Sequence, residues 1–171
     1  MHDFTRHVLS VLPSLIMANI CHMLIVKRNV FPVLNNAIAV NYFGNNKTWR
    51  GIILVPIFNV LFLLIFNSLL KLELENTISL GLLLGLAYVA FELPNSYIKR
   101  KLHIKPGETS ANKNYFFMLV DKTDSAFGVA FVYYLISSIT ITGAIFLMLI
   151  NSISHIVISL ILIFTKIKAS F

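Results

Sequence analysis

Two acidic residues, Asp121 and Asp124, stand three positions apart at the start of a long apolar stretch. If a helix begins near Asp121, both carboxylates lie on one face of that helix. Two carboxylates that converge at the edge of an apolar segment suit a hard divalent cation, and Mg²⁺ is commonly held by one or two carboxylates together with phosphate oxygens. Acidic residues also stabilise a helix N-terminus through the helix dipole, so the pair has an equally good explanation without a metal.

Basic residues occur at two further junctions between polar and apolar sequence. Lys47 and Arg50 are three positions apart before one apolar segment. Lys99 and Arg100 come about one helical turn after Ser96, at the end of another segment. Lys and Arg side chains clamp phosphate groups, particularly beside a helix N-terminus. For any single Lys, the enrichment of basic residues around membrane spans is the simpler explanation.

Polar residues also fall inside the apolar stretches. Glu92 stands near the end of one of them, where we expect its carboxylate to have a cation or a metal as its partner. Asn19 and His22 are three positions apart in the first apolar stretch, and His155 lies in the last one. Polar side chains at such places usually face the interior of a helix bundle. We therefore expect these three residues to serve helix packing.

Composition shows which elements must position these residues. The chain has 171 residues, of which 57% are hydrophobic and 12% are charged, whereas a soluble domain carries roughly 25% charged residues. A helix that crosses the hydrocarbon core needs about 20 mostly apolar residues. Residues 125–165 form an uncharged run of 41 positions, long enough for two spans joined near Thr140–Ala144, where Gly143 can turn the chain. We predict an all-α integral membrane protein, a single transmembrane domain with five transmembrane helices at about 8–26, 52–70, 77–93, 124–142 and 145–165.

The distribution of Lys and Arg predicts how these helices are oriented. The loop at 27–50 holds four basic residues, the loop at 95–123 holds six and the C-terminal tail holds two. The N-terminal tail and the connection after the second span hold one each. Because basic residues accumulate on the cytoplasmic side, we expect both long loops and the C-terminus in the cytoplasm and the N-terminus outside. The chain would then be a multi-pass protein of the cell (inner, cytoplasmic) membrane.

The net charge of +7 fits this arrangement. Because the basic residues flank apolar spans, we expect contact with anionic membrane lipids and no nucleic-acid partner. The single cysteine, Cys21, excludes an internal disulfide and a CxxC metal site. With three polar junctions on one side, the sequence predicts a phosphate-transfer or nucleotide site at the membrane surface. The sequence contains no Gly-rich phosphate-binding fingerprint, so side chains and metal would hold any nucleotide.

Four stretches of the chain resemble the CDP-archaeol synthase family, a branch of the membrane cytidylyltransferases that also includes CDP-diacylglycerol synthase. They span most of the chain in the family's order: Leu12–Pro13 with Ala18–Asn19, GNNKTWRG at 44–51, SYIKRKLHIKPG at 96–107, and DKTD at 121–124 with Gly128. The five-helix layout is also similar to that of the family. The blocks around KTWRG and SYIKR are the specific ones, whereas a DxxD pair alone is common.

The resemblance implies an enzyme that condenses CTP and a lipid phosphate to a CDP-lipid and pyrophosphate with Mg²⁺. It implies that the metal is held by Asp121, Asp124 and Glu92. The basic residues that would neutralise the triphosphate and the lipid phosphate are Lys47, Arg50, Lys99 and Arg100. The substrate-binding residues would be Asn19, Thr48, Asn95 and Ser96. The sequence leaves open whether the chain forms a homodimer.

The chain also departs from the family's pattern. Phe91–Glu92 replaces a Gly-Asp pair, and Lys122 replaces a Gln between the two acids. Asn35–Asn36 stand in a loop that is usually glycine-rich. These changes indicate a divergent branch, whose acceptor lipid need not be archaeol phosphate. The alternative is a non-catalytic membrane protein, either a small transporter or an assembly partner that reuses the fold. A transporter should place ionisable residues at the bilayer midplane, and here Glu92 is the acid nearest a span interior.

Overall fold

The computed structural model describes residues 2–104 and 115–167, with the side chains at 2, 3, 115–119 and 122 left out. Three of the basic residues that were counted above lie outside the described residues. They are Lys105 and Lys113 in the second predicted loop and Lys168 in the C-terminal tail. The elements in chain order are α1 (His2–Lys27), a short 3-10 helix η1 (Pro32–Asn35), α2 (Val40–Phe43), α3 (Trp49–Leu69), α4 (Thr77–Lys101), α5 (Tyr115–Ile136) and α6 (Ile141–Phe164).

The described residues are helical apart from their connections, and no strand forms among them. Among the described residues, four helical segments are long and apolar enough to cross a membrane, at Phe4–Lys27, Trp49–Leu69, Thr77–Lys101 and Ile141–Phe164. In the continuously described part of α5, Thr123–Ile136 is a shorter apolar segment. The all-α multi-pass membrane class is thus confirmed, and the count of five spans stays a prediction.

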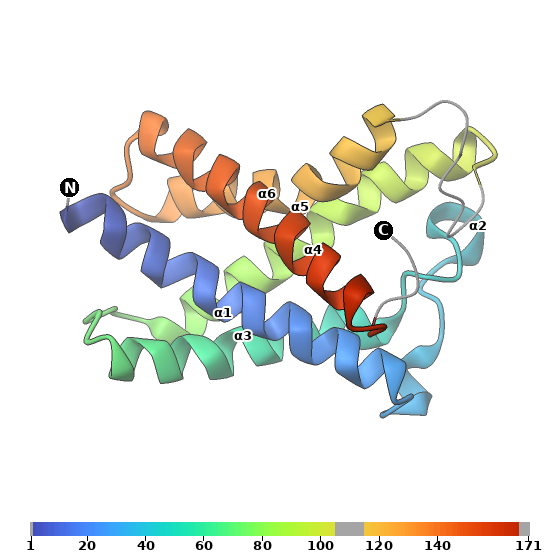
Figure 1. Ribbon diagram of the computed structural model, residues 1–171, viewed down its shortest axis with the longest axis horizontal. Helices are drawn as coiled ribbons and strands as arrows, with labels where there is room; N and C mark the ends of the chain where they lie inside the picture. Colours follow the sequence, from blue (N-terminus) through green and yellow to red (C-terminus); the bar gives the residue numbers. More distant parts are fainter. Residues whose placement is uncertain (1, 105–114, 168–171) are drawn as a thin grey trace.

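The long helices pack in chain order and close on themselves. Helix α1 packs on α3, α3 on α4, α4 on α5 and α5 on α6, and α6 returns to α1. They alternate in direction, so the N-terminus and the connections at 70–76 and 137–140 lie at one end of the molecule (Figure 1). The 28–48 connection and the last turns of α4 and α6 lie at the other end, which we call the loop end (Figure 1). This alternation is the one that the predicted orientation requires.

Close approach of α3 and α4 depends on two glycines spaced four apart. A Cβ atom at Gly81 would lie 2.8 Å from the Val60 Cα, and one at Gly85 would lie 2.5 Å from the Pro56 Cα. The amide of Asn59 then donates a hydrogen bond of 2.7 Å to the Gly81 carbonyl oxygen. Small residues spaced four apart are typical of a helix-packing face in a membrane protein, and Gly81 and Gly85 form such a face here.

The outer faces of these helices are apolar. Large side chains such as those of Leu64, Leu82, Phe131 and Ile153 are exposed. The buried core lies between α1, α3, α4, α5 and α6, and its least exposed members include Val11, Leu84, Val129 and Leu147. Apolar surface on this scale is unfavourable in water and ordinary in lipid.

Several helix ends differ from the predicted span ends. Helix α4 does not stop at residue 93 but continues through Pro94 to Lys101, so residues predicted to lie in a loop lie on its last turns. Helix α5 begins at Tyr115, earlier than the predicted 124. The connection between α5 and α6 lies at 137–140, earlier than the predicted turn. The Thr140 hydroxyl accepts a hydrogen bond of 3.1 Å from the Gly143 backbone N–H, so Gly143 lies in the first turn of α6.

Candidate functional site

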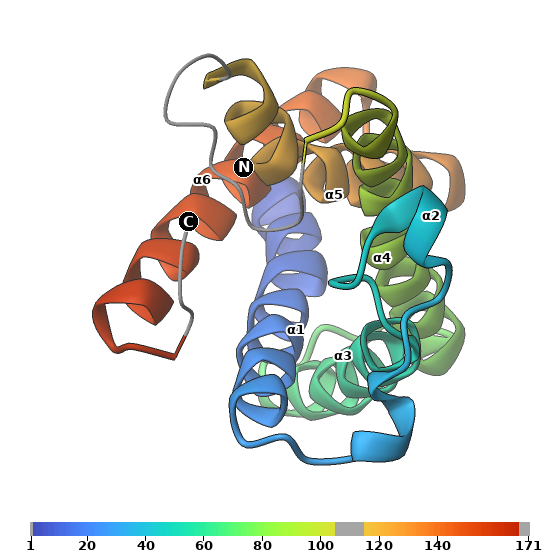
Figure 2. The same ribbon diagram turned by 90° about the vertical axis from the view of Figure 1, so that its right-hand side faces the viewer.

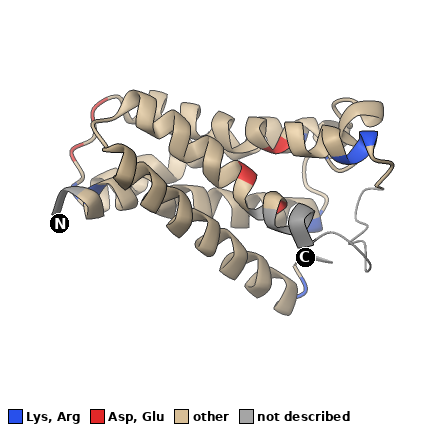
Figure 3. Ribbon diagram, turned by 90° about the horizontal axis from the view of Figure 1, so that it is seen from above, with Lys and Arg blue, Asp and Glu red and all other residues tan. Residues whose placement is uncertain are grey.

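Charged residues from separate segments meet near the loop end. Figure 3 shows basic segments at both ends of the molecule and acidic segments also within the helical body. Lys47, which precedes α3, forms an ion pair with Glu92 of α4. Lys99, two turns further along α4, forms an ion pair with Asp121 of α5. Both predicted phosphate-binding lysines therefore contact a predicted metal-binding carboxylate.

A single amide joins the two acids of α5. The Asn95 Nδ2 donates hydrogen bonds of 2.5 Å to the Asp121 Oδ1 and 3.1 Å to the Asp124 Oδ2. Asn95 is buried on α4, and its neighbours Glu92 and Lys99 lie one turn to either side of it on the same face. Because both carboxylates reach one nitrogen atom, Asp121 and Asp124 share a face of α5. Asp124 also accepts a hydrogen bond of 2.6 Å from the Ser125 backbone N–H.

The electrostatic environment keeps Lys47 charged. Burial alone would lower the pKa of its ammonium group, but the charge and the hydrogen bond of Glu92 outweigh burial. The charges of Asp124 and Asp121 add to the same effect, so the pKa of Lys47 lies above its ordinary value. Lys47 is therefore a fixed positive charge at neutral pH, and it lies near all three acids.

Helix α1 contributes a residue that sequence reasoning assigned to packing. His22 lies within electrostatic range of Glu92, Arg50 and Lys47. Its ring is next to Gly51, where a Cβ atom would lie 3.6 Å from the His22 Nε2. Among the described residues this buried Nε2 has no hydrogen-bond partner. The sequence signal was the spacing of His22 from Asn19 near the end of a span, and it does not show which helix the ring faces.

The two predicted arginines contact carbonyl oxygens of the backbone and of asparagine side chains rather than carboxylates. The Arg50 guanidinium donates hydrogen bonds to the Asn35 Oδ1 at 2.9 Å and the Val30 carbonyl oxygen at 3.2 Å. The Arg100 guanidinium donates to the Ile104 carbonyl oxygen just past the end of α4. Arg50 thus fastens the connection between α1 and α3, and Arg100 closes α4. Phosphate contacts by either arginine stay a prediction.

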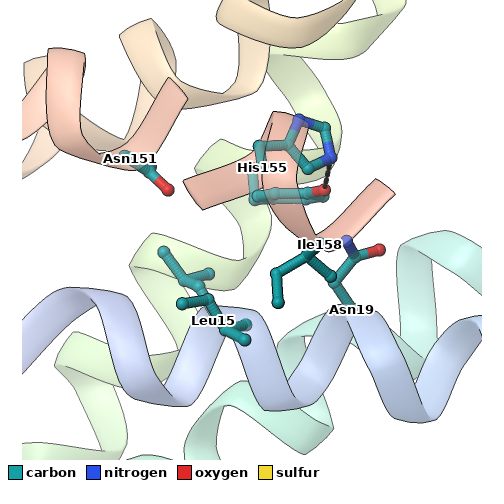
Figure 4. A pocket seen from close by; sticks show the side chains of 7 residues that line it. Leu15, Asn19, Asn151, His155 and Ile158 are labelled. Atoms are coloured by element: carbon teal, nitrogen blue, oxygen red, sulfur yellow. Dashed lines mark hydrogen bonds between the residues drawn. The ribbon is translucent and has the colours of Figure 1, made fainter. Parts of the chain in front are cut away.

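The predicted polar substrate ligands lie at three different places. The Ser96 hydroxyl donates a hydrogen bond of 3.0 Å to the Glu92 carbonyl oxygen within α4. Thr48 caps the start of α3 without a hydrogen bond from its side chain. Asn19 lies outside the cluster of lysines and acids, in a small pocket that it shares with Tyr88 and His155 (Figure 4).

The loop end carries aromatic residues beside the cluster. Figure 2 looks onto this end and shows the short α2 against α4. The exposed Tyr42 of α2 stacks on Tyr97 of α4 with ring centroids 6.1 Å apart. The Lys101 Nζ lies 5.0 Å from the centroid of the Tyr97 ring. This contact joins the connection that carries Lys47 to the helix that carries Glu92.

The donor set fits a metal bound by two carboxylates. In the part of the chain that the structure describes, no three His, Cys, Asp or Glu side chains lie close enough together to hold a metal ion. Asp121 and Asp124 do converge on one point, the Asn95 Nδ2. Since Mg²⁺ is held by one or two carboxylates plus substrate phosphates, this pair supplies suitable ligands. Glu92 is engaged by Lys47 and Asp121 by Lys99, so the metal-binding roles of Glu92, Asp121 and Asp124 stay predictions.

Comparison with known proteins gives one result. The family model described as CDP-archaeol synthase (CarS-like) matches residues 6–170, nearly the whole chain. No curated protein and no solved structure matches the chain.

Proposed function

The chain belongs to the CDP-archaeol synthase family, and on that premise we propose that it transfers the CMP group of CTP to a lipid phosphate and releases pyrophosphate. Family membership implies cytidylyl transfer to a lipid phosphate. One structural observation supports a site for it. The Asn95 amide holds Asp121 and Asp124 together between two lysine ion pairs. Such a site combines two carboxylates for a divalent cation with mobile amines for phosphate oxygens.

The proposed reaction needs no covalent intermediate. An oxygen of the lipid phosphate attacks the α-phosphorus of CTP and forms a new P–O bond. The bond between the α-phosphorus and its bridging oxygen to the β-phosphorus breaks, and pyrophosphate leaves with the electron pair. Catalysis of such a transfer is mostly positioning and neutralisation of negative charge. Both tasks suit lysines and carboxylates held on rigid helices.

The lysines are the residues of this chain that we assign to the phosphates. Lys47 and Lys99 each carry a flexible amine that is paired with a carboxylate. In the proposed complex each amine exchanges its carboxylate for a phosphate oxygen. Asp121 is thereby released from Lys99 and would bind Mg²⁺ together with Asp124. The bound Mg²⁺ would neutralise the triphosphate and the leaving pyrophosphate. Asn95 keeps the two carboxylates at the spacing in which the structure holds them.

The second part of the proposal concerns the position of the site relative to the membrane. The cluster lies near the loop end, towards which the predicted orientation places the cytoplasm. CTP would enter from that side, and the acceptor would arrive within the bilayer with its head group at the same level. Five spans, with α5 as the fourth and the N-terminus outside, would place the site at the cytoplasmic edge of the inner membrane.

The test uses CTP labelled at two positions. Purified protein in detergent micelles is incubated with Mg²⁺ and a panel of ether-linked and ester-linked lipid phosphates. CTP labelled at the α-phosphate should transfer its label to the lipid, and CTP labelled at the γ-phosphate should release it in pyrophosphate. The absence of CDP-lipid with every lipid phosphate, from a folded preparation, would overturn the proposal and favour the non-catalytic alternative. Label transfer from the γ-position to the lipid would instead indicate a kinase.

A further inference from the structure

A second polar site lies deeper in the helical body than the cluster of lysines and acids. It is a small pocket between α1, α4 and α6 (Figure 4). Its polar wall comes from Asn19, Tyr88, Asn151 and His155. The Tyr88 hydroxyl and the His155 Nε2 are 2.9 Å apart and hydrogen-bonded. The remaining wall is apolar and includes Leu15 and Ile158. Polar walls at this depth of a membrane protein commonly mark a binding site.

One donor in this wall has no partner. Asn151 is 5% exposed, and within the described part of the chain its Nδ2 makes no hydrogen bond. Figure 4 shows its side chain on α6 with the amide oxygen directed towards α1. A buried N–H group without an acceptor is costly, and in lipid no water compensates it. The pocket has a cavity volume of about 10 Å³, which is close to the space of one oxygen-sized group. The pocket is therefore suited to a single hydrogen-bond acceptor.

The pocket is connected to the cluster through α4. Tyr88 precedes Glu92 by one helical turn, a rise of about 5.4 Å along the helix axis. His155 lies within electrostatic range of Glu92. The pocket and the Lys47–Glu92 pair therefore lie about one helical turn apart along α4. The length of one helical turn is comparable to that of the glycerol unit between a lipid phosphate and the oxygens that carry its chains.

We propose that this pocket binds an ether or ester oxygen of the acceptor lipid, at the linkage between its glycerol unit and its chains. This inference rests on the proposed function. The Asn151 amide donates to that oxygen, the phosphate of the same lipid reaches Lys47 and Lys99, and the chains lie against apolar residues of α1 and α6. A single buried water is the competing occupant, since it would also accept a hydrogen bond from Asn151.

The first experiment separates the two substrates kinetically. Asn151→Leu keeps the size of the side chain and removes the donor. We expect the KM for the lipid phosphate to rise about tenfold, as for the loss of one hydrogen bond, and the KM for CTP not to rise. Asn19→Leu, on the opposite wall, should show the same split. The control is Ser152→Ala, because the Ser152 hydroxyl donates within its own helix to the Met148 carbonyl oxygen at 2.8 Å. Unchanged KM values in both Leu variants would indicate that water occupies the pocket, and they would overturn the inference.

The second experiment does not depend on turnover. Thermal unfolding of the protein is followed with and without lipid phosphate, in the absence of CTP. A ligand that binds only the folded state raises Tm, so lipid phosphate should raise the Tm of the wild type and of Ser152→Ala more than that of Asn151→Leu. If the Tm shifts differ in this way but no CDP-lipid forms, the proposed function is overturned and the lipid site is supported. CDP-lipid formation with equal shifts in all variants would overturn the lipid site alone.

Discussion

Lys47 forms an ion pair with Glu92, although 45 positions separate the two residues in the chain. One lies in the connection that precedes α3 and the other on α4. The backbone of Lys47 is fixed as well, since its carbonyl oxygen accepts a hydrogen bond of 2.9 Å from the Ile38 backbone N–H. The pair therefore connects a loop that faces the expected CTP side to the helix that carries Glu92, Asn95 and Lys99. Such a connection can serve the fold, the reaction or both.

A double-variant cycle separates these two roles of the Lys47–Glu92 pair. Lys47→Met leaves a partly buried carboxylate without a partner, and we expect a loss of about 1–3 kcal/mol in the free energy of unfolding and a large loss of kcat/KM. Lys47→Met with Glu92→Leu removes both charges and should regain most of the stability. Turnover should not return, because the phosphates still lack their lysine. Recovery of turnover in the double variant would show that Lys47 serves the fold alone.

Asp124→Asn should abolish turnover and spare folding. The substitution keeps the size of the side chain and an oxygen that can accept the hydrogen bond from Asn95, but it removes the charge that Mg²⁺ requires. We expect at least a hundredfold lower kcat and an unchanged elution volume in size-exclusion chromatography. Removal of Mg²⁺ with a chelator should have the same effect on the wild type. Glu73→Gln is the control, because Glu73 is an exposed acid at the opposite end of the molecule. Full activity of Asp124→Asn would refute the metal assignment.

Asn95 acts on the metal through the two carboxylates that it holds. Asn95→Leu should raise the Mg²⁺ concentration needed for half-maximal rate roughly tenfold, as for other residues that orient metal ligands. At saturating Mg²⁺ most of the rate should return. The matched control is Asn59→Leu, since Asn59 is another buried asparagine with one amide hydrogen bond, to the Gly81 carbonyl oxygen. That variant should lower Tm without changing the Mg²⁺ requirement. An equal Mg²⁺ requirement in both variants would mean that Asn95 only packs α4 against α5.

Thiol labelling of intact cells tests the predicted orientation. In a Cys21→Ala background, Glu73→Cys places a thiol in the connection between α3 and α4, and Val33→Cys places one in the connection before α3. Both positions are exposed. A membrane-impermeant reagent should label the first from outside and the second only after the membrane is permeabilised. The reverse pattern would invert the topology, and labelling of both from outside would contradict the span count.

The sequence predicted the class of the fold because long apolar segments have few alternatives. It placed helix ends less well, and Pro94 shows the reason. Proline usually ends or kinks a helix because it lacks the N–H group of the helical hydrogen bond, yet α4 continues through Pro94 to Lys101. Asn95, Ser96, Lys99 and Arg100 therefore lie on the helix and not in the predicted loop.

The site shows a similar limit. Spacing alone predicted that Asp121 and Asp124 share a helix face, and the common contact with Asn95 confirms it. The partners across helices were not predictable, because they depend on the register of α4 against α5. Such contacts between separate segments include the ion pairs Lys47–Glu92 and Lys99–Asp121. They also include the electrostatic interaction of His22 with Glu92. A single sequence carries periodicity within each helix but no record of how two helices meet.

Arg50 distinguishes a residue that shapes the loop from one that binds phosphate. Its guanidinium reaches both the Val30 carbonyl oxygen and the Asn35 Oδ1, and its side chain is buried. The loop residue Asn36 in turn accepts a hydrogen bond of 3.1 Å from the Trp49 backbone N–H, beside Lys47 and Thr48. Arg50→Lys keeps the charge but cannot make the forked contact. We therefore expect Arg50→Lys and Arg50→Ala to lower the free energy of unfolding by similar amounts, about 1–3 kcal/mol.

Limited proteolysis and steady-state kinetics decide between the two roles of Arg50. If Arg50 shapes the loop, both variants should be cleaved faster within residues 28–36, and kcat should fall because Lys47 is no longer held in place. If Arg50 contacts a phosphate of CTP, Arg50→Lys should keep the wild-type Tm and cleavage pattern and raise only the KM for CTP. The contacts with Val30 and Asn35 favour the first outcome. A guanidinium whose N–H groups already bind a backbone carbonyl oxygen and a side-chain oxygen of the connection must release them before it can reach a substrate.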